Sequence, residues 1–281
     1  MTLHLDRLGT RASAPPYTVT QEATVAYARA TNDENGEHLA GVLAPPLFAV
    51  VPALKTMAAL KRQVVEGFTL HGEHELRLHR PIEPGMTLAV DAEVIGIRPS
   101  RAGPLVVVRG ETRDQRGELL NEQYLVSVAH GRKLEDGVGR DAPAHRRPEG
   151  LGKNALIAEL SYPVDADQTL RYAEASGDRD PYTFDHAEAR ARGLPGAIVH
   201  GLCTMAFVAR AVVARCCGAD SRRLKRLAVR FSGLLLLEPG QQLTTRLWRA
   251  GTNDGRAVVV AESDDREGES VIRHGWAEIG T

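Results

Sequence analysis

The chain contains an internal repeat, and this repeat limits the folds that it can adopt. The segment YTVTQEATVAYARATND, at residues 17–33, aligns without gaps on YPVDADQTLRYAEASGD, at residues 162–178, with seven identical residues among seventeen. A long apolar segment follows each copy, and a Pro-Gly pair follows that segment, at 84–85 in the first half and at 239–240 in the second. We therefore expect two halves that share one architecture.

The segment between the two copies is expected to separate the halves. The stretch GRKLEDGVGRDAPAHRRPEG, at 131–150, is charged and rich in glycine and proline, which is typical of a solvated linker. The predicted domains are 1–130 and 151–281. A length of 281 residues with 43% hydrophobic residues is enough to give a core to both halves.

Each half shows the same predicted order of elements. A short strand is followed by a helix, an irregular polar loop, a long apolar helix and several strands. The short strands are expected at 17–19 and 162–164, the long helices at 47–65 and 201–217, and the later strands at 88–98, 105–114, 122–130, 227–237, 242–250, 257–265 and 271–279. Alternating apolar residues and turn signals favour antiparallel pairing, so the predicted fold class is α+β. The two sheets are expected to join edge to edge, because joining hides edges that otherwise promote aggregation.

Composition excludes several classes of protein. A net charge of −1 provides no general attraction to nucleic acid or to an anionic membrane surface. No apolar run reaches the roughly eighteen residues of a membrane-spanning helix, and no N-terminal signal sequence is visible. The three cysteines lie together within 203–217, which is typical of buried thiols and lacks the spacing of metal ligands. We expect a cytoplasmic protein with no metal, no nucleic-acid partner and no membrane association.

Residues around the second copy of the repeat carry a resemblance to a known family. Tyr172, Gly177, Asp178, Pro181 and the stretch GLPGAIVHGLCTMAFVARAVV, at 193–213, are similar to the MaoC-like or hydratase-2 dehydratases. The first half resembles the diverged N-terminal domain of two-domain members, through YARATNDEN, APPLFAVVP and HRPIEPG. The resemblance implies a double hot dog fold, in which a curved antiparallel sheet wraps one long helix in each half. The two halves would then form a pseudo-dimer, and two chains a possible homodimer.

The resemblance also implies a reaction. Members of the family add water to, or remove it from, the α,β double bond of an acyl thioester. The expected partner is an acyl-CoA or acyl-carrier-protein thioester, and no cofactor is expected beyond the coenzyme A or phosphopantetheine of the substrate. This chemistry needs an acid–base pair for the water and the Cα proton. It also needs a donor that polarises the thioester carbonyl as negative charge builds there.

The His-Gly step at 200–201 is the predicted source of that donor. Gly201 opens the long apolar helix, so its N–H is one of the unpaired first-turn amides at the positive end of the helix dipole. A glycine also lets a thioester approach the backbone closely. The simpler interpretation is that Gly201 permits close packing of helix and sheet. His200 is either a structural histidine or a contact to substrate.

The family's acid–base loop, Asp-x-Asn-Pro-x-His, is altered in the second half. Asp178 is present, but Asp180 occupies the asparagine position and Thr183 the histidine position. A threonine hydroxyl can hold a water but is no base near neutral pH. Two close carboxylates would raise one pKa, so Asp180 is a partial substitute. His186 is another, if it shares a helix face with Thr183; an exposed helix residue is its simpler interpretation.

The first half preserves the residues that the second half has lost. The gap-free alignment places Asp33 on Asp178, Asn35 on Asp180 and His38 on Thr183, although no His-Gly step follows. Asp33 and His38 are therefore candidate catalytic residues, and solvated loop residues are the alternative. The function predicted from the sequence is a hydratase or dehydratase of acyl thioesters. A non-catalytic hot dog protein that binds an acyl thioester or a polyketide-like intermediate is the second prediction, and a thioesterase the third.

Overall fold

The computed structural model describes residues 2–143 and 152–280. The first half contains η1 (Leu5–Arg7), β1 (Arg11–Ser13), β2 (Tyr17–Thr18), α1 (Gln21–Ala30), α2 (Gly36–Leu39), η2 (Pro46–Val50), α3 (Val51–Val64), β3 (Leu70–Leu78), β4 (Thr87–Arg98), β5 (Leu105–Arg113), β6 (Leu119–Val128) and β7 (Val138–Gly139). The second half contains β8 (Ala155–Pro163), α4 (Gln168–Ser176), η3 (Pro181–Thr183), α5 (His186–Ala191), α6 (Gly201–Cys216), η4 (Ser221–Arg223), β9 (Leu224–Phe231), β10 (Gln242–Asn253), β11 (Arg256–Asp264) and β12 (Ser270–Ile279).

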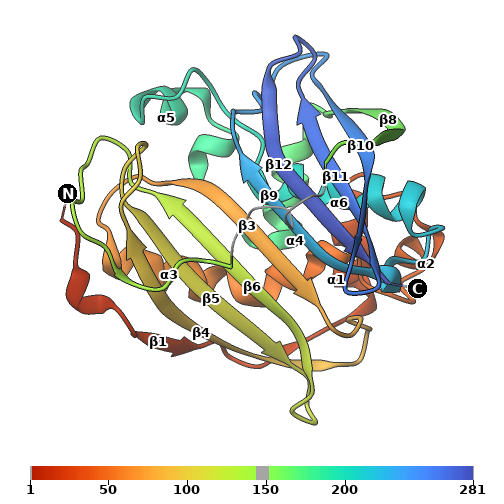
Figure 1. Cartoon of the computed structure of the whole chain (residues 1–281), viewed down its shortest axis with the longest axis horizontal. Coiled ribbons are helices and arrows are strands. Elements are labelled where there is room, and N and C mark those ends of the chain that lie inside the picture. The colour runs from red at the N-terminus through yellow and green to blue at the C-terminus, as the bar shows by residue number, and fades with distance from the viewer. Residues whose placement is uncertain (1, 144–151, 281) are drawn as a thin grey trace.

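One continuous antiparallel sheet runs through both halves (Figure 1). Its strands follow the order β1-β4-β5-β6-β3-β9-β12-β11-β10-β8, and β2 and β7 pair with β4 at its margin. The halves meet where β3 pairs with β9, with Glu73 opposite Arg230 and Arg77 opposite Arg226. The predicted edge-to-edge junction is therefore confirmed. The edge strand of each half covers the edge strand of the other half.

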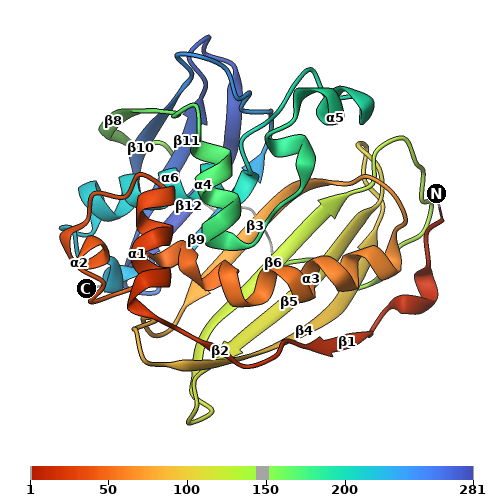
Figure 2. The same cartoon turned by 180° about the vertical axis from the view of Figure 1, so that it is seen from behind.

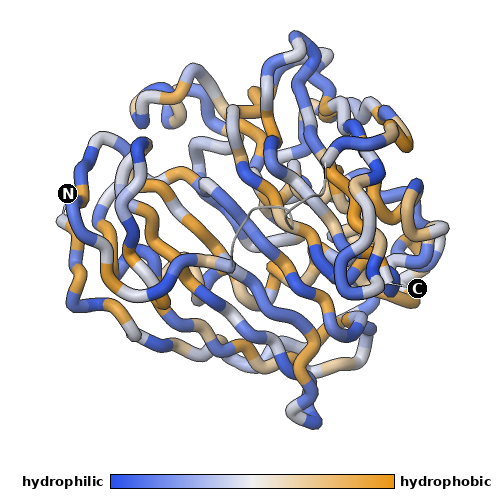
Figure 3. Tube along the Cα trace, viewed as in Figure 1, coloured by the Kyte–Doolittle hydropathy of each residue, from blue (hydrophilic) through white to orange (hydrophobic). Residues whose placement is uncertain are grey.

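The helices lie on one face of this sheet (Figure 2). Helix α3 packs on β4 and β5, and α6 packs on β8 to β11. Every residue from 202 to 209 in α6 is buried, as expected for a helix that is apolar on nearly all sides. Hydrophobic and hydrophilic residues alternate along much of the sheet (Figure 3). Alternation of this kind gives a sheet one apolar face, on which the helices can pack.

The repeated segments pack against each other where the halves meet. Helices α1 and α4 are in contact, and the rings of Tyr27 and Tyr172 lie with their centroids 5.8 Å apart. These two tyrosines occupy the same position of the repeat, and both are fully buried. The α+β double hot dog predicted from the sequence is confirmed.

Several parts of the architecture differ from the predicted elements: the strand expected at 227–237 is β9 and ends at Phe231, and the helix expected at 47–65 is divided into η2 and α3. Strand β3 was not predicted, because LHGEHELRL places polar residues next to one another and so hides the alternation of a strand. Pairing with β6 on one side and β9 on the other nevertheless buries His74 and Glu75. Strand β8 is also longer than expected, since it begins at Ala155.

The predicted linker at 131–150 lies partly outside the described residues, which omit 144–151. Its described part is not entirely free of the sheet, because Val138 and Gly139 form β7 and pair with β4. None of the helices in the described ranges is both long enough and apolar enough to cross a membrane.

Candidate active site

The loop after α4 presents Asp178 through a tight turn. Helix α4 ends at Gly177, whose φ of 78° lies in the left-handed region that glycine enters without steric cost. The chain reverses there, and Pro181 then begins the short helix η3. Thr183 closes η3, because its Oγ1 donates to the Asp180 carbonyl at 2.7 Å and its N–H donates to the same oxygen at 3.0 Å. The Thr183 hydroxyl is therefore committed to holding its own turn.

The first turn of α6 lies beside this loop. His200 is the N-cap residue, and its side chain does not cap the helix. Within the described ranges the Gly201 N–H donates to no acceptor, so it keeps a free hydrogen at the positive end of a sixteen-residue helix. A Cβ added to Gly201 would lie 3.3 Å from the Phe231 ring, so the first turn of α6 is closely packed against β9.

A cavity of about 640 Å³ joins these two features. Asp178, Thr183, His200 and Gly201 line its polar part. Its apolar wall comes from both halves and includes Leu54, Leu105, Val126, Ile198, Leu202 and Leu235. Four of the seven site residues predicted from the sequence thus lie around one chamber, and this chamber has the size and mixed lining of a small-molecule site.

Burial sets the protonation of the acid and the histidine in this chamber. It raises the pKa of the Asp178 carboxyl, and nearby Asp180 adds to the rise, whereas His200 and Lys61 oppose it. Burial also lowers the pKa of His200, against the pull of the Asp178 carboxylate. The His200 Nε2 lies 3.1 Å from the Asp178 carbonyl oxygen, and a carbonyl only accepts. Nε2 therefore donates, which leaves Nδ1 as the acceptor nitrogen of a neutral ring.

Residues in and near the site also come from the first half, and His71 and Lys61 were missed in the sequence. His71 of β3 lines the cavity, with its ring centroid 5.0 Å from that of Phe231. Its Nε2 is buried and has no hydrogen-bond partner in the described part of the chain. Burial lowers the pKa of His71 to about 3, and Lys61 adds to this effect, so the ring is neutral at pH 7. Lys61 of α3 interacts electrostatically with Asp180 and Asp178, which partly offset the fall in its pKa caused by burial.

Asp180 and His186 do not complete the acid–base machinery. The side chain of Asp180 is exposed and is not part of the cavity wall; its carbonyl holds Thr183. His186 begins α5, which is separate from η3, so the expectation that His186 and Thr183 share a helix face is wrong. The His186 Nδ1 accepts from the Ala197 N–H at 3.2 Å, and this bond ties the following segment to α5.

The first-half pair lies elsewhere in the molecule. The Asp33 Oδ2 is 2.7 Å from the His38 Nδ1, and the His38 Nε2 is 2.9 Å from the Ser221 Oγ. His38 is only 1% exposed, and neither Asp33 nor His38 lines the large cavity. The structure therefore does not bring this pair together with Gly201, although the two loops occupy the same position of the repeat.

Comparisons with known proteins agree with this fold and show the family of the chain. Residues 151–270 match the model of the MaoC like domain, and residues 7–123 match that of the FAS1-like dehydratase domain region. The chain is 35% identical over 216 residues to 3-hydroxyacyl-thioester dehydratase Y of Mycobacterium tuberculosis. The aligned region covers 74% of this chain and 72% of that protein. The chain therefore belongs to the MaoC-like dehydratase family.

Longer relatives and solved structures extend the similarity over most of the chain. The peroxisomal multifunctional enzyme type 2 of Drosophila melanogaster is 28% identical over 256 residues, which cover 86% of this chain but only 41% of that longer protein. The crystal structure of a MaoC-like dehydratase from Phytophthora capsici superposes with a TM-score of 0.84 at 23% identity, covering 99% of this chain and 98% of that one. At this identity the superposition supports the fold alone.

Proposed function

We propose that this protein hydrates or dehydrates an acyl thioester in the large second-half cavity. The observation that carries the proposal is the position of the free Gly201 amide and the Asp178 carboxyl on the wall of one chamber that continues into an apolar space. Relatives named enoyl-CoA hydratase 2 and 3-hydroxyacyl-thioester dehydratase support the reaction class. The substrate is accordingly an α,β-unsaturated or a 3-hydroxyacyl thioester.

The Gly201 amide would polarise the thioester carbonyl. Removal of the Cα proton, or addition of water to the double bond, places negative charge on that oxygen, and a preorganised N–H at a helix end stabilises it. The apolar wall would hold the acyl chain. Exposed Arg101, which also lines the cavity, is positioned to meet a phosphate of coenzyme A or of a carrier arm.

Asp178 would perform the proton transfers. Its raised pKa brings the carboxyl closer to the working pH, where a group can both take and return a proton. Neutral His200 and His71 provide hydrogen-bonding nitrogens that can hold the water. In this arrangement Thr183 supplies no base, because a hydroxyl is not basic near neutral pH, and its hydrogen is bonded to the Asp180 carbonyl.

That bond of Thr183 favours a second candidate, a protein that binds an acyl thioester without transforming it. Crotonyl-CoA separates the two. We expect its ultraviolet absorbance to fall steadily as the double bond is hydrated by the purified protein. Saturable binding with no loss of absorbance above that of the Asp178→Asn variant would instead support the binding protein.

Three predictions from the sequence remain proposals. These are that the reaction needs no cofactor beyond the coenzyme A or phosphopantetheine of the substrate, that the protein is cytoplasmic, and that two chains form a homodimer. The pseudo-dimer within one chain already provides the paired hot dog halves from which the site is built.

A further inference from the structure

Three side chains form a hydrogen-bonded row at the first-half loop, and none of them lines the large cavity. Asp33 contacts His38, and His38 contacts Ser221, at the distances of 2.7 and 2.9 Å given above. We propose that Asp33, His38 and Ser221 form a second, nucleophilic site that cleaves short-chain acyl esters or thioesters. This activity is distinct from hydration and uses none of the residues around Asp178.

The hydrogen bonds assign the protons of the row. A carboxylate only accepts, so the His38 Nδ1 must carry the hydrogen that is bonded to Asp33. When the ring carries this one proton, Nε2 is the acceptor and the Ser221 hydroxyl donates to it. This is the arrangement in which a histidine removes the proton of a serine nucleophile while a carboxylate fixes its tautomer and stabilises the imidazolium that forms.

The loop geometry holds the row rigidly across the two halves. The Asp33 Oδ1 accepts from the Asn35 N–H at 2.9 Å, and the Asn35 side chain caps α2 while donating to the Ala219 carbonyl at 2.7 Å. The Glu37 carboxylate forms two bonds with the Arg222 guanidinium, at 2.7 and 2.9 Å. Ser221 is therefore fixed against His38 by contacts on both sides of it.

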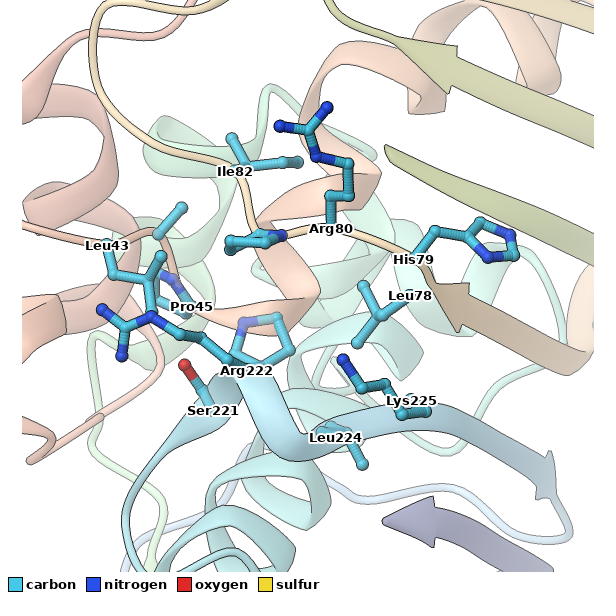
Figure 4. Close-up of a pocket in the computed structure, with 13 residues that line it drawn as sticks. Leu43, Pro45, Leu78, His79, Arg80, Ile82, Ser221, Arg222, Leu224 and Lys225 are labelled. Carbon is cyan, nitrogen blue, oxygen red and sulfur yellow. The ribbon is translucent and has the colours of Figure 1, made fainter. Parts of the chain in front are cut away.

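Ser221 opens onto a small pocket (Figure 4). Its volume is about 30 Å³, which is room for roughly two water molecules and so for an acetyl-sized group. Leu43, Ala44 and Pro45 give it an apolar side. In Figure 4, Ser221 and Lys225 come from one segment, and the segment with His79 and Arg80 lies across from them. Lys225 also lines this pocket, so it places a cation on the same wall as Ser221.

The reaction balances with groups that are present. The Ser221 oxygen forms a bond to the acyl carbon as its proton passes to the His38 Nε2. The bond from the acyl carbon to the leaving oxygen or sulfur then breaks, and the proton passes from His38 to that leaving group. A water attacks the acyl-serine in a second round, with His38 again as the base, and releases the carboxylic acid and free Ser221.

The test uses methanesulfonyl fluoride, a small reagent that transfers its sulfonyl group to an activated serine and releases fluoride. We expect intact-mass and peptide analysis to show one sulfonyl group on Ser221 of the wild-type protein. His38→Gln should slow that labelling by about 10²-fold or more, because it removes the general base. Hydrolysis of p-nitrophenyl acetate should be lost in Ser221→Ala.

Matched controls keep the result interpretable. Ser161→Ala removes a serine whose hydroxyl is bonded to the Thr244 hydroxyl at 2.8 Å rather than to a histidine, so it should label like the wild type. Circular dichroism melting shows whether each variant is folded. An unmodified Ser221 in folded wild-type protein, with trypsin labelled in the same tube, would overturn the proposal. Equal labelling rates in wild type and His38→Gln would overturn it as well. Crotonyl-CoA plays no part in this test, so its outcome is independent of the proposed hydratase.

Discussion

The two loops that follow the repeated helices began from the same pattern and now differ in opposite ways. The first-half loop has the carboxylate and the histidine, but His38 is enclosed and bonded at both nitrogens beside a pocket of about 30 Å³. The second-half loop has lost the histidine to Thr183, yet it faces a chamber of about 640 Å³. The first half has the acid–base pair beside a small pocket, and the second half has the large chamber without the histidine.

This difference between the loops shows that the chemistry open to a catalytic motif depends on the size of the pocket beside it. The partner residue of each loop comes from the opposite half. Glu37 pairs with Arg222, whereas Tyr182, at the equivalent position of the repeat, packs its ring against Phe68. The ion pair and the Ser221 contact draw the first-half loop tightly onto its neighbour. In the second half, the chamber beside the loop stays open to an acyl chain.

Removing the second-half carboxylate should have the largest effect. Asp178→Asn takes away the proposed acid–base group, so the rate of crotonyl-CoA hydration should fall by about 10²–10⁴-fold. The variant should also resist unfolding better at neutral pH. The pKa of Asp178 is raised in the folded state, so its ionisation costs stability as pH rises above the value of the unfolded chain. A variant that hydrates like the wild type would remove Asp178 from the mechanism.

The helix-end donor can be tested by a pair of substitutions at one position. Gly201→Ala and Gly201→Pro both add a Cβ beside Phe231, but only proline removes the N–H. Proline is tolerated in the first turn, and His200 already has an extended backbone with ψ of 132°. Hydration should be about 10²–10³-fold slower in the proline variant than in the alanine variant. Equal rates in the two folded variants would show that the amide does not contact the carbonyl.

Placing a histidine at the position of Thr183 tests whether the second-half loop lacks only this residue. Thr183→His places an imidazole at the position that lines the cavity beside Asp178. We expect hydration to become faster, by about tenfold or more, because a second proton-transfer group then joins the carboxyl. The rate at saturating crotonyl-CoA is the measurement. A rate that does not rise in a folded Thr183→His protein would mean that Asp178 with its neutral histidines already completes the site.

The reciprocal exchange in the first half should affect stability more than hydration. His38→Thr leaves the Asp33 carboxylate and the Ser221 hydroxyl without their buried partner, which should cost about 1–3 kcal/mol in the free energy of unfolding. Urea unfolding measures this loss, which should exceed that of the exposed His186→Thr, a variant that removes the bond from the Ala197 N–H. The rate of crotonyl-CoA hydration per folded molecule should not fall with this loss of stability. If it does, the first-half pair contributes to that reaction after all.

His71 should have the smallest effect on stability, measured as a change in the pH dependence of unfolding. Its folded pKa of about 3 lies below that of an unfolded histidine, so its contribution to stability is present above about pH 6.5 and is lost as pH falls toward 3. The unfolding temperature of His71→Asn should therefore fall less between about pH 7 and about pH 5 than that of the wild type. His200 is retained in both proteins and does not contribute to the difference. Parallel curves would show that His71 is not buried as a neutral ring.

Much of the architecture could be predicted from the sequence because local signals repeat. The matched segments around Tyr27 and Tyr172, the apolar run of α6 and the two Pro-Gly pairs each act within a short window. The contents of the two pockets depend instead on long-range contacts. Ser221 meets His38 from 183 residues away, and His71 reaches the second-half chamber only because β3 pairs with β9. No local pattern predicts either contact, so the sequence could identify both loops without showing which one faces a substrate.

The central claim is that the thioester binds in the second-half chamber, with its carbonyl at the α6 end. A crystal structure of Asp178→Asn with crotonyl-CoA bound tests this directly, because slow turnover preserves the ligand. The account predicts the carbonyl oxygen within hydrogen-bond distance of the Gly201 N–H and the acyl chain between Leu54 and Leu202. A thioester seated instead against His38 and Ser221, with the large chamber empty of ligand, would contradict it.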